Sequence, residues 1–112
     1  MSALILTDTN YNLWVDKMKT LLQLSECWDM IGTEFKELEA TALANLGADQ
    51  QKDYIECWHR DLHAIWMIKS YVEDLIFLRI TGATNAYQAW STLESAYKGT
   101  NRIKMMRLQN LR

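Results

Sequence analysis

The residues best suited to chemistry lie close together in residues 49–72, where two histidines and a cysteine occur within a short interval. His59 and His63 are four residues apart, and on a helix this spacing brings two imidazoles onto one face, where they can chelate a metal ion. Cys57 does not share that face, so the three side chains are a poor ligand set. The sequence offers no second ligand pair. We therefore interpret His59 and His63 as ordinary half-exposed histidines and predict neither a metal nor another cofactor.

A catalytic site is not indicated by the sequence. A nucleophilic cysteine needs a base and an oxyanion site, but on a helix Cys57 points away from His59. The sequence has no glycine-rich phosphate loop and no paired-carboxylate motif, and its four glycines are few for shaping a pocket. We predict that the protein is not an enzyme and that it has no small-molecule substrate.

Asp61 interrupts an otherwise apolar helix face, and two interpretations apply to it. One is a catalytic acid. The other, which we favour, is a structural carboxylate, because an acidic group that is buried without a partner is strongly destabilising. We expect Asp61 to accept a hydrogen bond from a tryptophan indole or from a helix N-terminus. Lys69 interrupts the same face, but its long stem lets the ammonium reach water.

Residues 49–72 are predicted to form one long amphipathic helix around which the other elements pack. At about 100° per residue, their apolar side chains fall in one arc of roughly half a turn, and polar residues occupy the opposite side. A helix that is apolar over this width must be covered from more than one direction. The arc consists of Tyr54, Ile55, Cys57, Trp58, Leu62, Ile65, Trp66, Ile68 and Val72.

Length and composition limit the class of protein. A chain of 112 residues is predicted to be one domain over residues 1–112, and its 49% of apolar residues favour a folded globular chain. A net charge of -2 argues against a nucleic-acid binder, which would show a basic stripe. No apolar run approaches the roughly 20 residues of a membrane span, and the first residues lack the features of a signal peptide. We expect a cytoplasmic protein whose Cys27 and Cys57 are buried thiols.

Two helices are predicted ahead of the central one. Residues 4–6 form a short apolar arm that packs against the bundle or against another molecule. Thr9 or Asn10 is expected to cap the first helix. Ser25 is expected to cap a short second helical segment, which Gly32 ends.

The pattern after these helices is less regular. Residues 33–49 have only loose helical spacing, which fits either a surface helix or a mobile connection. Helical spacing continues over residues 73–80, after a kink predicted near residues 70–74, and Thr84 is expected to cap a helix over residues 85–98. Residues 102–112 are basic and could contact phosphate, but four basic residues among eleven fit a solvated helix face better. The sequence ends within that helix without a stop signal, so we expect the domain to be truncated there. Together these elements predict an all-α fold, a small helical bundle of about five to six helices.

Four motifs follow one another along the chain. The first is Asn-Tyr-x-x-Trp, which leads into a helix ending in paired leucines, and the second is a tryptophan-containing turn over residues 27–31. The third is Trp-x-x-Asp-x-x-Ala-x-x-x-Ile in the central helix, and the fourth is Ala-Trp-x-x-Leu followed by a tyrosine. In chain order they are Asn10, Tyr11, Trp14, Met18, Leu21 and Leu22; Trp28; Trp58, Asp61, Ala64 and Ile68; and Ala89, Trp90, Leu93 and Tyr97.

In this order and spacing, the motifs resemble the amino-terminal capsid region of the Gag polyprotein of copia-type LTR retrotransposons, over nearly the whole chain. The resemblance implies a mostly helical capsid domain that associates with itself and helps to assemble virus-like particles around the RNA of the element. The expected partner is a second copy, as a dimer in isolation or a lattice in full Gag. The resemblance also accounts for Asp61, because the family pattern carries an aspartate within the helix face.

The parts of a full Gag that are missing from this sequence limit what the resemblance implies. The carboxy-terminal capsid half, the basic region and the zinc knuckle of a full Gag do not occur in this sequence, so we expect no direct binding of nucleic acid from this fragment. We also expect no membrane partner, because no apolar run is long enough to span a membrane. An alternative function is that of a co-opted or truncated Gag-derived host protein that modulates or inhibits particle assembly. An isolated short gene would favour this alternative, and a downstream reverse transcriptase in the same reading frame would favour the first function.

Two sets of residues follow from these interpretations. Assembly contacts are expected from apolar side chains away from the central helix, and packing of the core is expected from the motif residues and the central helix. The assembly candidates are Leu4, Ile5, Leu6, Leu13, Leu24, Ile103, Met106 and Leu111. The core candidates are Tyr11, Trp14, Leu21, Trp28, Trp58, Asp61, Ile65, Trp90, Leu93 and Tyr97.

Overall fold

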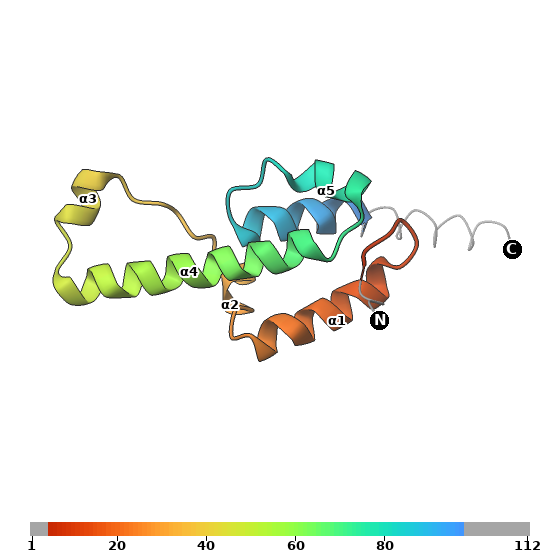
Figure 1. The fold of residues 1–112 in the computed structure, drawn as a ribbon, viewed down its shortest axis with the longest axis horizontal. Coiled ribbons are helices and arrows are strands. Elements are labelled where there is room, and N and C mark those ends of the chain that lie inside the picture. Colours follow the sequence, from red (N-terminus) through yellow and green to blue (C-terminus); the bar gives the residue numbers. More distant parts are fainter. Residues whose placement is uncertain (1–4, 98–112) are drawn as a thin grey trace, which may run out of the picture.

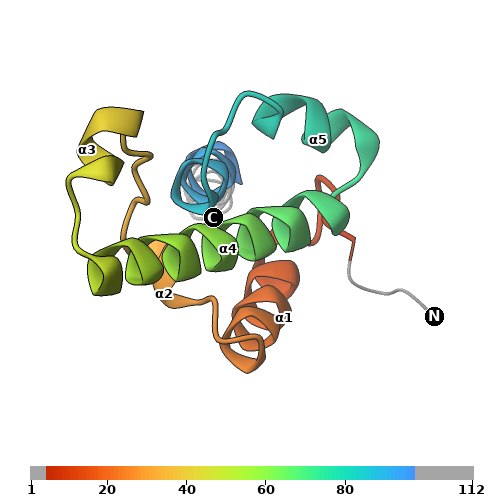
Figure 2. The ribbon, with the colours of Figure 1, turned by 60° about the vertical axis from the view of Figure 1, so that its left-hand side comes forward.

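The longest helix, α4 (Ala48–Ser70), lies along the long axis of the computed structural model, which describes residues 5–97, and most other helices pack around its second half (Figure 1 and Figure 2). The predicted all-α class is confirmed, with six helices in the described part of the chain. The central helix, predicted over residues 49–72, starts one residue earlier and ends two residues earlier. The other helices are α1 (Tyr11–Leu24), α2 (Asp29–Gly32), α3 (Ala40–Ala44), α5 (Asp74–Ile80) and a last described helix over residues 86–97.

The kink predicted after the central helix is a complete break. Residues 71–73 leave the helical conformation, and Val72 forms an isolated parallel bridge with Leu6 of the N-terminal arm. The Leu6 N–H donates to the Tyr71 carbonyl at 2.8 Å, and the Glu73 N–H donates to the Leu6 carbonyl at 3.1 Å. Leu6 is completely buried, so its assignment as an assembly contact is wrong. Its side chain fills the core instead, because the two backbone bonds hold the arm against the end of α4.

Asn10 explains why the arm turns back before α1 begins. It stands at the N-cap position, as predicted, but its side chain makes no capping bond to the helix. Instead, Asn10 Oδ1 accepts from the Thr7 N–H at 2.7 Å, and Asn10 Nδ2 donates to the Ile5 carbonyl at 2.8 Å. This side chain therefore closes the turn that joins the arm to α1.

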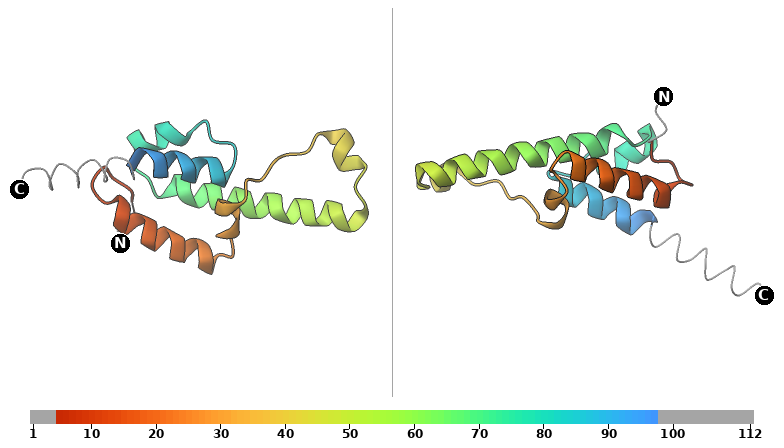
Figure 3. Two further views of the ribbon diagram at one scale, coloured as in Figure 1. Left: turned by 180° about the vertical axis from the view of Figure 1, so that it is seen from behind. Right: turned by 90° about the horizontal axis from the view of Figure 1, so that it is seen from below.

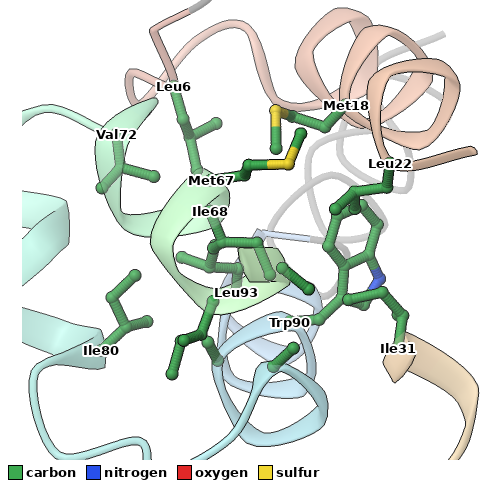
Figure 4. Packing of buried hydrophobic residues seen from close by; sticks show 14 of the residues in the cluster. Leu6, Met18, Leu22, Ile31, Met67, Ile68, Val72, Ile80, Trp90 and Leu93 are labelled. Atoms are coloured by element: carbon green, nitrogen blue, oxygen red, sulfur yellow. The ribbon is translucent and has the colours of Figure 1, made fainter. Parts of the chain in front are cut away.

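The interior contains a continuous series of aromatic rings. The ring of Tyr11 stacks on Tyr97 at 5.5 Å, Trp14 stacks on Trp90 at 5.6 Å, and Trp28 meets Trp90 edge-on at 5.4 Å. All five rings come from motif residues. Aliphatic and sulfur-containing side chains from α1, α4, the arm and the 86–97 helix converge beside them (Figure 4). The fully buried members include Leu6, Met18, Leu22, Ile68 and Leu93.

Most of the predicted core residues are buried, and one is misplaced. Tyr11, Trp14, Ile65, Trp90, Leu93, Tyr97 and Asp61 are confirmed as buried, and Leu21 and Trp28 are half-buried against the core. Trp58 is 38% exposed, so its assignment to the core is wrong. The physical reason is that the neighbouring helices cover only part of the apolar arc of α4.

Two predicted helix caps are also corrected. Ser25 follows α1 as its C-cap, and Trp28 occupies the N-cap position of α2. Gly32 ends α2, as expected. At the start of the 86–97 helix the cap is Asn85 rather than Thr84, because Asn85 Oδ1 accepts from the Gln88 N–H at 2.8 Å.

Residues 33–47 form a long excursion from the bundle. They run in an extended path to the short helix α3, which buries no side chain, and Gly47 then caps α4 by donating its N–H to Gln50 Oε1 at 3.2 Å. The helix α3 and the start of α4 lie at the end of the molecule away from α1 and α5 (Figure 1 and Figure 3). The sequence predicted either a surface helix or a mobile connection for residues 33–49. A surface helix is found for only part of this segment, as α3. Among the described helices, none is long and apolar enough to cross a membrane.

Candidate functional site

The histidines that opened the sequence analysis lie on the exposed side of α4. His59 stacks against Trp58 at 5.7 Å, and His63 lies 6.4 Å from the ring of Trp66. Cys57 is half-buried on another side of the helix, facing a pocket that it shares with Phe35, Tyr54 and neighbouring residues. Within residues 5–97, no group of three or more histidine, cysteine, aspartate or glutamate side chains is arranged to hold a metal ion.

Cys27 is a buried thiol without the features of a nucleophile. Its Sγ donates to the Ser25 carbonyl at 3.2 Å, and burial is the main cause that raises the pKa of the Cys27 thiol. Because the thiolate is the reactive form, a raised pKa keeps the sulfur protonated and inert at neutral pH. The role of this cysteine is to fill space between α1 and α2.

Asp61 is a buried carboxylate with a hydrogen-bond donor, as predicted from its position in an apolar helix face. It is 1% exposed, and Asp61 Oδ1 accepts a hydrogen bond of 3.0 Å from the backbone N–H of Ala86, the first residue of the 86–97 helix. Burial raises the pKa of the Asp61 carboxyl, and the bond to Ala86 opposes that rise. Of the two predicted donors, the helix N-terminus is confirmed. The side chain joins α4 to the 86–97 helix.

A second polar cluster joins residues 33–47 to the bundle. Glu34 Oε2 accepts from Asn85 Nδ2 at 3.2 Å and from Gln88 Nε2 at 2.9 Å. Asn85 Nδ2 also donates to the Phe35 carbonyl at 2.9 Å. The bonds from Gln88 and Asn85 hold the pKa of the Glu34 carboxyl below its usual value. The sequence analysis missed this cluster, although an asparagine three residues before a glutamine is a capping signal that points to Asn85.

A groove with a volume of about 580 Å³ lies between α2 and the 86–97 helix. Arg60 forms an ion pair with Asp29 at its edge. The groove offers the Ser91 hydroxyl but no histidine, cysteine or lysine to activate it. Its lining does not form a catalytic arrangement, and it consists of Trp28, Asp29, Ile31, Gly32, Thr33, Tyr87, Trp90, Ser91 and Glu94.

An exposed apolar row lies on α4, which we call the α4 stripe and define as Ile55, Trp58, Leu62 and Trp66. These side chains are 43%, 38%, 45% and 62% exposed, respectively. Their spacing of three, four and four residues places them on one face of the helix. The sequence analysis assigned all four to the buried arc, and the structure corrects this. Contiguous apolar surface of this kind on a small domain marks an interaction site.

The predicted assembly residues divide into three groups. Leu13 and Leu24 lie on α1 and are 57% and 78% exposed, which leaves them accessible. Ile5 is half-buried, and the buried Leu6 belongs to the core. The remaining four, Leu4, Ile103, Met106 and Leu111, lie outside the described residues. The structure therefore adds the α4 stripe to the accessible candidates and removes Leu6.

No protein-family model, no curated protein and no solved structure matches this chain. Its function is therefore inferred from its residues and their arrangement.

Proposed function

We propose that this chain is a structural self-association module, the amino-terminal capsid domain of a copia-type Gag polyprotein. The observation that carries the proposal is the α4 stripe, which exposes two tryptophans and two aliphatic side chains on the longest helix of the bundle. Tryptophan is the residue type most enriched at the energetic centres of protein interfaces. A surface of this composition fits contact with another protein better than it fits chemistry on a small molecule.

The motifs behind the resemblance give this proposal a second support, because they coincide with the contacts that hold the helices together. The indole Nε1 of Trp14 donates to the Tyr71 carbonyl at 2.8 Å, and Tyr97 donates its hydroxyl proton to Asp8 Oδ1 at 3.0 Å. Asp61 joins α4 to the 86–97 helix. The motif residues on which the resemblance to the Gag family rests thus include residues that hold the helices of this bundle together.

The proposed role needs only weak contacts between copies. In a shell made of many copies, each contact becomes an intramolecular one once its neighbours are in place, so modest affinities add up to a stable assembly. The particle is proposed to form in the cytoplasm around the RNA of the element. With a net charge of -2, this chain is proposed to supply contacts between proteins and to leave binding of the RNA to other parts of Gag.

The test is the molar mass of the 112-residue chain by light scattering coupled to size exclusion, over the widest concentration range that solubility allows. We expect the mass to rise with concentration from the monomer value of 13.1 kDa to that of a dimer or a larger species. A constant 13.1 kDa at every concentration, with a helical circular dichroism spectrum, would contradict a self-association module.

A further inference from the structure

We infer that the α4 stripe is the contact between two copies of this chain, which pair with their α4 helices antiparallel about a two-fold axis that passes between Trp58 and Leu62. The inference rests on the proposed self-association and adds the surface and its geometry. Four observations carry it: the exposure of the stripe, its spacing, the order of its side chains and its size.

The stripe is exposed where a helix normally buries its apolar face. On the core side, α4 buries Ala64, Ile65, Met67 and Ile68 against the other helices. The stripe lies beside that face and spans twelve residues, whose eleven steps of about 1.5 Å give it a length of about 16 Å. Steps of three and four residues are those of the seam along which two helices pack side by side. The expected occupant is therefore another helix lying along α4.

The order of the side chains makes the stripe complementary to itself. A two-fold contact brings the same surface of both copies together, so its pattern must fit its own reverse. From Ile55 to Trp66 the stripe alternates aliphatic and aromatic side chains, and its reverse alternates aromatic and aliphatic ones. In an antiparallel pair, Trp66 meets Ile55 of the second copy, and Trp58 meets Leu62 of the second copy. Each large ring then faces a smaller side chain.

A parallel pair fits this surface less well. Each residue would face the same residue of the second copy, so tryptophan would face tryptophan at two positions along the helix pair. The antiparallel arrangement avoids this pairing of like rings. Lysines meet in both arrangements, Lys69 with Lys69 in the parallel pair and Lys52 with Lys69 in the antiparallel one, so the shape of the side chains and not their charge favours the antiparallel pair.

The size of the stripe indicates a weak, reversible pair. A stable interface buries about 800 Å² on each partner, and a fully buried tryptophan contributes about 150–250 Å². Two partly exposed tryptophans and two aliphatic side chains supply less than that standard area. Exposed polar residues border the stripe, as expected for the rim of an interface, and they include Lys52, Glu56, His59 and His63.

The first experiment compares charge substitutions on two exposed surfaces of the full chain. The double variant Leu62→Lys with Trp66→Lys should raise the dissociation constant of the dimer at least tenfold by sedimentation equilibrium. The matched control, Leu75→Lys with Leu78→Lys, also replaces two exposed apolar side chains with lysines, but on α5, and should leave that constant unchanged. Both should keep the thermal midpoint of the wild type. Ile55→Lys tests the other end of the stripe with a single change.

The second experiment tests orientation. In a Cys57→Ser background, Lys52→Cys and Lys69→Cys are made as separate proteins, mixed and joined with a short thiol cross-linker. The antiparallel pair brings position 52 of one copy near position 69 of the other, so the mixture should give mainly the mixed cross-link. A majority of cross-links between identical positions would overturn the antiparallel geometry.

The outcomes separate this inference from the proposed function. If the wild type dimerises and the stripe variants do not weaken it, the α4 stripe is not the contact, although self-association stands. The same holds if the dimer is lost only with Leu13→Lys and Leu24→Lys, or only with Met106→Glu and Leu111→Glu. If the wild type stays monomeric throughout, the proposed function fails and the inference fails with it.

Discussion

At the scale of single residues, Asp61 illustrates how a carboxylate can belong to an apolar core. Its position between α4 and the first turn of the 86–97 helix places it where backbone N–H groups lack helical partners, and it accepts one of them. The favourable end of the helix dipole adds to this bond. The residue is therefore best understood as a cap that comes from a different element.

Asp61→Ala should destabilise the fold by about 1–3 kcal/mol, because it leaves the buried N–H of Ala86 without an acceptor. Asp61→Asn keeps an oxygen acceptor and should cost less. The pKa of the Asp61 carboxyl is higher in the folded protein than in the unfolded chain. The stability that this carboxyl contributes is therefore fully present below the unfolded pKa and falls as the pH rises through the folded pKa. Urea unfolding at pH 4 and pH 7 should therefore show a wild-type advantage over Asp61→Asn that shrinks at the higher pH. An Asp61→Ala variant as stable as the wild type would refute the capping role.

Tyr11 should set part of the response to alkaline pH. Burial, with a smaller contribution from the charge of Glu94, raises the pKa of its hydroxyl to about 12. Because the folded pKa is raised, stability should fall between the unfolded value near 10 and about 12. Tyr11→Phe removes this titration, so circular dichroism across this range should show a smaller loss of stability than in the wild type. Tyr87→Phe, at an exposed tyrosine, is the control and should behave as the wild type.

The burial of single residues was predicted correctly from the sequence where the residue packs inside its own chain. The prediction failed where an apolar residue lies on the surface. Trp14 and Trp90 follow from the motif spacing and are buried. Trp58 and Trp66 have the same helical periodicity as a core face, but they are exposed. Periodicity shows that a face is apolar, and it does not show whether the partner surface belongs to the same chain.

At the scale of elements, the start of the 86–97 helix depends on a side chain that the sequence analysis did not choose. Asn85 is 3% exposed and combines the cap of its own helix with bonds to residues 34 and 35. Thr84, the predicted cap, is exposed, and its hydroxyl donates only to the side chain of Gln88. The local pattern allowed either residue, and the tertiary contacts of Asn85 decide between them.

Asn85→Ala should therefore lower the free energy of unfolding by about 1–3 kcal/mol, since it removes a cap and leaves buried polar groups unpaired. Thr84→Ala should change it by less than about 0.5 kcal/mol, as is usual for exposed positions. Chemical denaturation of both variants beside the wild type measures the difference. Equal losses in the two variants would indicate that the cap is shared between Thr84 and Asn85.

At the scale of the whole molecule, stability should be distributed unevenly along the chain. No residue between 32 and 60 is buried, whereas the second half of α4 supplies five buried residues to the core. Local opening is easiest where few apolar side chains are buried. The same helix should thus combine a weakly protected first half with a firmly held second half.

Native-state hydrogen exchange measures this difference directly. Amides of residues 48–57 should exchange faster than those of residues 61–70, although both stretches lie in one continuous helix. At protein concentrations high enough to form the dimer, hydrogen exchange of the amides around the α4 stripe should be slower if two copies pair there. Uniform protection along α4 would show that the first half is held by contacts that the single chain lacks.

The connection between the ends of the described chain has a consequence for synthesis on the ribosome. Tyr97 reaches back over 89 positions to Asp8, and Leu6 pairs with the residues that follow α4. A nascent chain leaves the ribosome from its N-terminus, so the arm and α1 emerge long before their partners have been made. Contacts this distant in sequence also form slowly. The aromatic face of α1 therefore stays exposed until translation has passed residue 97. A chaperone that shields this face during that interval would favour correct folding.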